Sequence, residues 1–215
     1  MSEEKKTSGL SVKSFKPALI LFVITLVAGL ALSGVYALTK DTIEAQQLAA
    51  NAEAYQAVCP DATSFEYEDA SSAAIEALDG EVYGTDFGKA YINEAAVGVD
   101  DDGNIVGYVI SVTSGDGFDG DITLVVGFQT DGTINSIEFT ELNETAGMGM
   151  LCAEDEFKSQ FDGVKTDSFT LIKSGGSTED NEIDSVSGAS TSSGAVVNAV
   201  NAAIDFFNTY FGEGA

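Results

Sequence analysis

Hydrophobic and polar residues change their spacing several times along the chain, and each spacing predicts a different kind of element. The first pattern is a run of 22 residues, Pro17 to Leu38, without a charged side chain. As a helix this run is roughly 33 Å long, which matches the hydrocarbon core of a bilayer. A secretory signal peptide, the competing interpretation, has an apolar stretch of only about 7–15 residues. The run therefore predicts a retained transmembrane helix at residues 17–38.

In the middle of the chain, segments rich in β-branched and aromatic residues flank two turn signals. Two similar stretches, residues 97–105 and 126–134, each contain an Asp-Gly pair. An Asp-Gly pair between alternating segments is a strong signal for a β-hairpin. The pattern predicts a curved antiparallel sheet, with strands near residues 95–100, 104–113, 122–129 and 133–140.

Helical patterns lie on both sides of this sheet region. Residues 40–58 are rich in Ala, Gln and Glu and end before Pro60, which predicts an outward extension of the membrane helix. A short helix is expected at Ala153–Phe161, followed by a strand near Ser168–Ile172 and a polar loop at residues 174–181. A final helix is predicted by apolar residues that recur at steps of three and four, namely Val197, Val200, Ile204, Phe207 and Phe211.

Charge gives these elements an orientation and excludes one class of partner. The formal net charge is −26, from 35 acidic residues and nine basic ones, all of which are lysine. Four of the lysines precede Pro17, and basic residues at one end of a membrane helix place that end in the cytoplasm. The acidic remainder then lies outside the cytoplasm. A domain of this charge is a poor nucleic-acid binder.

The predicted fold class is therefore α+β, with a single transmembrane helix followed by an extracytoplasmic domain. That domain has a curved antiparallel sheet and flanking helices. The predicted boundaries are a cytoplasmic tail at 1–16, the transmembrane helix at 17–38, a helical extension at 39–60 and the extracytoplasmic domain at 61–215.

The inventory of side chains favours an organic cofactor over a metal. The chain has no histidine, so it can build neither a histidine zinc site nor a Ser-His-Asp triad. Its two cysteines, Cys59 and Cys152, are too few for an iron–sulfur cluster. They could form a disulfide outside the cell or remain two buried free thiols. No metal site is predicted.

The segment with the most specific chemistry runs from Asp184 through Ser190, directly ahead of the final helix. The unpaired N–H groups and the helix dipole at such a start favour an anion. The alternative is an ordinary N-cap formed by small hydroxyl residues.

The order Asp-x-x-Ser-Gly-Ala-Ser resembles the flavinylation motif of the FMN-binding domain family. The resemblance implies covalent FMN, which a flavin transferase joins through its phosphate to the last hydroxyl of the motif, here Ser190. Neighbouring Thr191 is the alternative acceptor, since the family more often has Thr at the acceptor position. The donors expected around the phosphate are Ser187, Gly188, Ala189 and Thr191, while Asp184 is expected to shape the turn or to assist the transferase.

Two other stretches resemble segments of the same family. One is the glycine-rich stretch 115–120, and the other is Glu-Thr-Ala-Gly-Met-Gly at residues 144–149, where the family usually has Pro in place of Ala146. Thr145, Gly147 and Met148 are the candidates there for contact with the flavin ring, because glycines permit close approach and a methionine sulfur packs well against aromatic systems. An ordinary glycine turn with core methionines is the alternative.

In its length and its single N-terminal anchor, the chain most resembles the G subunits of Rnf electron-transport complexes. These are related to the C subunits of sodium-translocating NADH:quinone reductases. This resemblance implies an electron-transfer subunit of a membrane ion-translocating ferredoxin:NAD oxidoreductase, a redox carrier rather than an enzyme alone. Its implied partners are the other membrane, iron–sulfur and flavin subunits. Two alternatives are a stand-alone extracellular flavoprotein and a membrane-anchored, non-redox binding domain.

Overall fold

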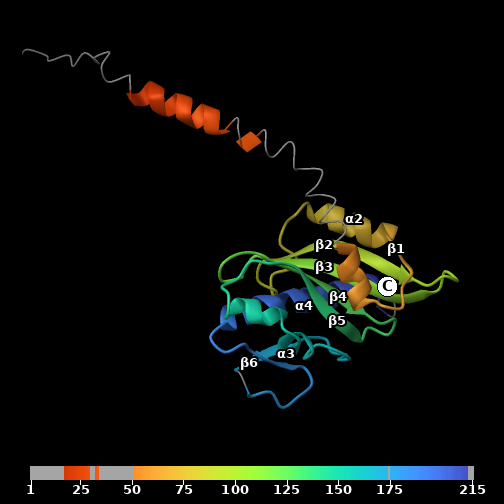
Figure 1. Ribbon diagram of the computed structural model, residues 1–215. Helices are drawn as coiled ribbons and strands as arrows, with labels where there is room; N and C mark the ends of the chain where they lie inside the picture. Colours follow the sequence, from red (N-terminus) through yellow and green to blue (C-terminus); the bar gives the residue numbers. More distant parts are fainter. Residues whose placement is uncertain (1–16, 30–31, 34–50, 174, 213–215) are drawn as a thin grey trace, which may run out of the picture. The chain divides into compact units, whose positions relative to one another are not determined.

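A computed structural model describes residues 17–29, 32–33, 51–173 and 175–212 of the chain (Figure 1). The chain divides into two compact units, Met1–Ala49 and Ala50–Ala215. In the first unit, residues 17–29 are helical. Among the described residues, no helix combines the length and the hydropathy needed to cross a membrane. The predicted span at 17–38 falls partly outside these residues, as does most of the predicted extension at 39–60.

The second unit is an α+β domain around a five-stranded antiparallel sheet. The strands follow the order β1-β2-β3-β4-β5. Their bounds are β1 (Ser64–Glu66), β2 (Ala90–Val99), β3 (Ile105–Ser114), β4 (Ile122–Phe128) and β5 (Ile134–Leu142). The remaining elements are α2 (Asp69–Leu78), η1 (Gly149–Ala153), α3 (Asp155–Lys158), β6 (Thr170–Ile172), β7 (Glu182–Asp184) and α4 (Ser190–Tyr210).

The two predicted Asp-Gly hairpins are confirmed. In the β2–β3 turn, the Asp100 carboxylate accepts hydrogen bonds from the backbone N–H groups of Asp102 and Asn104, at 2.9 and 2.8 Å. In the β4–β5 turn, Asp131 accepts from the Thr133 N–H at 2.9 Å. Each turn therefore satisfies its own backbone. The hydrogen bonds from Asn104 also lower the pKa of the Asp100 carboxyl.

Helix α4 covers one face of the sheet, as its predicted apolar face requires. Val197, Val200, Ile204 and Phe207 of that face are all buried. They pack on alternate strand residues such as Ile110, Leu124 and Val126, which form the main core. The Phe207 ring stacks on Phe128 of β4, with centroids 4.7 Å apart and an interplanar angle of 15°. In Figure 1, α4 lies behind the strands.

The opposite face of the sheet receives the helical residues 51–58. Tyr55 and Val58 form a second core with Val109 and Val125, whose neighbours in sequence belong to the main core with α4. In Figure 1, the orange 51–58 helix lies in front of the strands. Three glycines on adjacent strands let this segment approach the sheet closely. A Cβ on Gly98 or Gly107 would lie 2.9 Å from the Cys59 sulfur, and one on Gly127 would lie 2.2 Å from the Val58 carbonyl oxygen. The end of the 51–58 helix thus packs directly against the backbone of the sheet at these glycines.

The two cysteines are free thiols, so the second of the two sequence interpretations is confirmed. Both are buried. Cys59 belongs to the second core and Cys152 to the main core, on opposite faces of the sheet. Burial raises the pKa of the Cys59 thiol, and it raises that of Cys152 to about 11.

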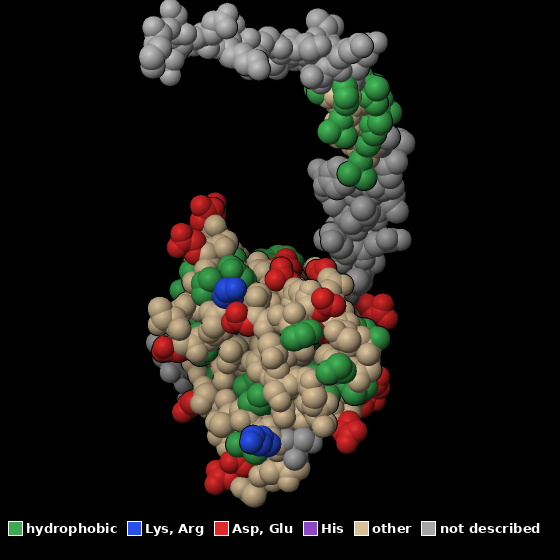
Figure 2. Space-filling view, turned by 90° about the vertical axis from the view of Figure 1, so that its left-hand side faces the viewer, with side chains coloured by type: hydrophobic (Ala, Val, Ile, Leu, Met, Phe, Trp, Pro, Cys, Tyr) green, Lys and Arg blue, Asp and Glu red, His purple; other side chains and the backbone are tan. Residues whose placement is uncertain are grey.

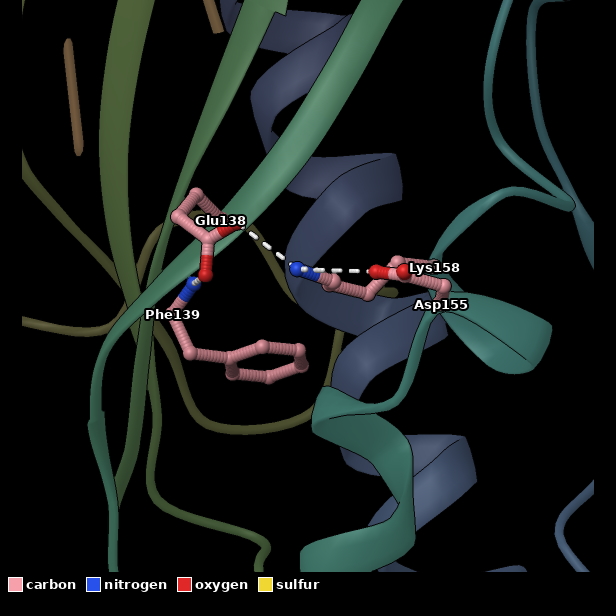
Figure 3. Close-up of polar contacts among 4 residues, drawn as sticks. All are labelled: Glu138, Phe139, Asp155 and Lys158. Atoms are coloured by element: carbon pink, nitrogen blue, oxygen red, sulfur yellow. Dashed lines mark hydrogen bonds and ion pairs between the residues drawn. The ribbon is translucent and has the colours of Figure 1, made fainter. Parts of the chain in front are cut away.

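The region after β5 is less regular than predicted. The helix expected at 153–161 is present only as the one-turn helix α3, and η1 precedes it. Lys158 of α3 makes an ion pair with Glu138 of β5 at 2.7 Å and a longer one with Asp155 at 3.8 Å (Figure 3). The shorter pair ties α3 to the sheet, which a four-residue helix needs because its own hydrogen bonds are few.

Several short elements had no clear sequence signal. The strand β2 begins at Ala90, earlier than the predicted residue 95, and β1 and α2 were not predicted. The predicted strand near Ser168–Ile172 is β6, but its parallel partner β7 was missed. Three-residue strands are stabilised by their partners rather than by their own propensity.

On the face seen in Figure 2, acidic side chains are spread around the edge.

Candidate functional site

Three segments that are far apart in sequence line one pocket of about 110 Å³ in the α+β domain. The first contributes Phe118, from the connection between β3 and β4. The second is the stretch 144–149 that follows β5, and the third is the start of α4. The lining residues are Phe118, Glu144, Thr145, Met148, Gly149, Gly188, Ala189, Thr191 and Ser192.

The loop before α4 is held to the helix by Ser193. The Ser193 hydroxyl accepts a hydrogen bond from the Val186 N–H and donates one to the Ala189 carbonyl, each at 3.0 Å. Between these two residues, Gly188 has a φ of +81°, which a residue with a side chain rarely adopts. The tight loop therefore has a defined shape where it meets the first turn of α4.

The predicted acceptor hydroxyls lie at the beginning of this helix. Ser190 is its first residue and is exposed, as are Ser187 and Thr191. Gly188 and Ala189 line the pocket, and so does Thr191, whereas Ser190 and Ser187 are not among the lining residues. Both acceptor candidates are thus open to a modifying enzyme, and Thr191 is the one nearer the cavity.

Asp184 lies away from the pocket and organises the preceding loop. Its carboxylate accepts hydrogen bonds from the backbone N–H groups of Gly176 and Ser177 and from the Ser177 hydroxyl, at 2.8, 3.1 and 2.7 Å. The hydroxyl bond is the main reason that the pKa of Asp184 falls below its usual value. These contacts join Asp184 to the loop that precedes β7.

The second predicted segment meets the first inside the pocket. A Cβ added to Gly188 would lie 3.5 Å from the terminal methyl of Met148. Thr145 and Met148 line the cavity. Gly147, with a φ of +75°, allows the turn between them but does not line it. Two motifs that are well separated in the chain therefore form a single site.

Four of the lining residues were not predicted as site candidates. Phe118 and Gly149 belong to the two glycine-rich stretches that resemble family segments, and Ser192 follows the motif. Glu144 is the unexpected one, because a carboxylate that is only 9% exposed lies in the wall of the pocket. Its position in the 144–149 stretch was the one signal for it, since the burial of an acid depends on distant segments.

The pocket suits one part of a phosphorylated aromatic cofactor. The first turn of α4 has no acidic side chain and presents unpaired N–H groups, as an anion requires. Phe118 and Met148 are 71% and 45% exposed at the rim and offer apolar surface to a ring. The cavity is smaller than the roughly 300–1,000 Å³ of most ligand pockets, so much of such a ligand would lie outside it. These residues fit FMN.

Fold and pocket together define an FMN-binding domain. Residues 117–205, which contain all three lining segments, match the sequence model of the FMN-binding domain family, and residues 11–58 match that of the RnfG N-terminal region. The crystal structure of NqrC from Shewanella oneidensis has a similar fold, with a TM-score of 0.51 and 25% identity. This similarity covers 61% of this chain and 66% of NqrC.

Full-length relatives narrow the class to one family. The chain is 32% identical to the G subunit of the Na(+)-translocating ferredoxin:NAD(+) oxidoreductase complex of Acetobacterium woodii, over 90% of this chain and 91% of that protein. It is 30% identical to the G subunit of the ion-translocating oxidoreductase complex of Methanosarcina acetivorans, over 92% and 96%. The chain belongs to the family of G subunits of Rnf-type ion-translocating oxidoreductase complexes.

Proposed function

We propose that this chain is the electron-carrying flavoprotein subunit of an ion-translocating ferredoxin:NAD oxidoreductase complex, with FMN joined through its phosphate to Ser190. The observation that carries the proposal is the pocket of about 110 Å³ in which Gly188 and Thr191 meet Thr145 and Met148 at the start of α4. The name of the Acetobacterium woodii relative supplies the ferredoxin:NAD oxidoreductase complex, and that of the Methanosarcina acetivorans relative supports an ion-translocating oxidoreductase complex.

Each part of the pocket has a distinct task in this proposal. The backbone N–H groups of the first turn of α4, with Gly188 beside them, hold the phosphate. Phe118 and Met148 lie against the ring and exclude water from part of it. FMN, when bound, supplies the redox chemistry, and the protein tunes it through hydrogen bonds and burial. The chain itself makes and breaks no bond in a small substrate.

A covalent bond suits the charge of this protein. FMN carries about two negative charges near neutral pH, and the chain has a net charge of −26. The field of such a protein disfavours an anionic ligand, while a helix start contributes only about 0.3–2 kcal/mol of preference for a negative charge. An ester between the phosphate and Ser190 prevents dissociation whatever the field.

The same proposal includes a membrane topology. Residues 17–38 form a single transmembrane helix, the lysine-flanked N-terminus is cytoplasmic, and the FMN domain lies outside the cytoplasm. The partners are the other membrane, iron–sulfur and flavin subunits of the complex, and a flavin transferase acts during maturation. The uncharged 22-residue run is the supporting observation.

Intact-mass measurement of the natively matured chain, with peptide mapping, tests the cofactor and the attachment together. The expected mass is that of the chain plus one FMN joined with loss of water, and the modified peptide contains Ser190. Ser190→Ala should remove the added mass and the fluorescent band on a denaturing gel. Thr191→Ala, the matched variant one residue away, should keep both.

The result separates the two acceptors and the two classes of function. Loss of FMN in Thr191→Ala but not in Ser190→Ala would identify Thr191 as the acceptor. An unmodified chain from its own host would refute covalent flavin altogether. Co-purification of the wild-type protein with several membrane subunits separates a complex subunit from a stand-alone flavoprotein.

A further inference from the structure

Glu144 has one carboxylate oxygen that is buried in the pocket wall and lacks a hydrogen-bond partner. Its other oxygen, Oε1, accepts a hydrogen bond from the Phe118 N–H at 2.7 Å. Within the described part of the chain, Oε2 is the one buried side-chain oxygen or nitrogen with no partner. The side chain is only 9% exposed, so water reaches it poorly. An unpaired buried acceptor is costly, and native proteins rarely keep one without a reason.

Oε2 lies beside Gly149 and the Ser192 hydroxyl, in the wall of the pocket. A Cβ added to Gly149 would lie 2.6 Å from Oε2 and 2.7 Å from the Ser192 hydroxyl oxygen. Both oxygens therefore pack closely around Gly149, and a side chain at this position would collide with them. Glu144, Gly149 and Ser192 all line the pocket. Burial is the main cause of the raised pKa of the nearby Cys152 thiol, and the charge of Glu144 raises it further.

We infer that Glu144 is a ligand-positioning residue whose Oε2 accepts a hydrogen bond from a donor of the bound FMN. FMN has two kinds of donor that suit a carboxylate, the ring N–H and the hydroxyls of its ribityl chain. A carboxylate accepts and cannot donate, so it selects for these groups. Because the Phe118 N–H holds Oε1, the free oxygen is already oriented before the ligand arrives. The inference rests on the proposed function.

A conservative substitution separates this role from a merely structural one. In Glu144→Gln, the amide oxygen can still accept the Phe118 hydrogen bond, but an NH₂ group replaces the free acceptor. A purely structural Glu144 would therefore tolerate Gln equally well with and without flavin. A ligand-positioning Glu144 would not, because the NH₂ group would then face a donor of the ligand.

The experiment compares thermal unfolding of the full chain produced with and without the flavin transferase, with FMN content checked by intact mass. Without flavin, Glu144→Gln should unfold about 2–6 °C above the wild type, because a neutral amide costs less to bury than an unpaired carboxylate oxygen. With flavin attached, the same variant should unfold below the wild type. Glu141→Gln removes a charge from an exposed residue of β5, three positions before Glu144, and should change neither form.

The outcomes distinguish this inference from the function beneath it. If the wild type carries FMN and Glu144→Gln gains as much stability from the flavin as the wild type does, Glu144 does not contact the ligand and the proposed function stands. If the wild type from its own host carries no FMN, both fail together. A flavin-dependent loss of stability in Glu144→Gln alone supports the contact.

Discussion

Replacing Gly127 with alanine tests how the 51–58 helix is joined to the sheet. The added methyl would lie 2.2 Å from the Val58 carbonyl oxygen, 2.7 Å from its Cβ and 2.8 Å from its carbonyl carbon. All three are far closer than two non-bonded heavy atoms approach, and two of them belong to the backbone. A rotamer change cannot relieve such a clash, so either β4 or residue 58 must move.

The magnitude follows from the two ways in which the protein can respond. If the segment stays, overpacking costs about 1–3 kcal/mol. If it separates from the sheet, Val58, which is 1% exposed, loses a burial worth about 1.5–3 kcal/mol, and Tyr55 loses its packing as well. We expect Gly127→Ala to destabilise the domain by about 2–3 kcal/mol. For a domain of this size, that lowers the unfolding temperature by about 4–12 °C.

Thermal unfolding followed by circular dichroism provides the measurement, and a second glycine provides the control. Gly194 lies inside α4, and an added methyl there meets only the Leu171 side chain, at an ordinary 3.7 Å. Gly194→Ala should stabilise the protein by up to about 1 kcal/mol, since glycine is a poor helix former. An unfolding temperature for Gly127→Ala within about 2 °C of the wild type would show that the close approach at Val58 does not constrain the fold.

Two further predictions concern the loop and the thiols. Ser193→Ala should lower the free energy of unfolding, measured in urea, by about 1–3 kcal/mol, because the Val186 N–H loses its acceptor. The control, Thr209→Ala, removes an exposed hydroxyl from the same helix and should have little effect. Equal losses in the two variants would contradict the bridging role of Ser193. Burial raises the pKa of Cys152 from 9.0 to about 11, so the folded state keeps a proton that the unfolded state releases. The contribution of the protonated Cys152 thiol to stability is complete below about pH 9 and is lost as the pH rises toward 11. Between pH 9 and 11, the urea midpoint of Cys152→Ser should therefore fall less than that of the wild type.

Local patterns were enough to predict the central elements of this protein. The Asp-Gly turns at residues 102–103 and 131–132 place β2 to β5, because turn conformation depends on the residues of the turn itself. The 3.6-residue period predicts α4 and its buried face, because side-chain direction in a helix repeats with sequence position. The order of residues from Asp184 to Ser190 is visible in the sequence as a resemblance to the flavinylation motif, because that motif lies within seven consecutive positions.

Tertiary structure alone decided the features that join distant segments. The close approach of Val58 to Gly127 and the pairing of β6 with β7 join residues from separate segments of the sequence. The unpaired oxygen of Glu144 is of the same kind, because its burial comes from the β3–β4 connection and from α4. Propensity and period act over a few neighbours, whereas burial and the partners of a polar group are set by whatever the whole fold brings beside it.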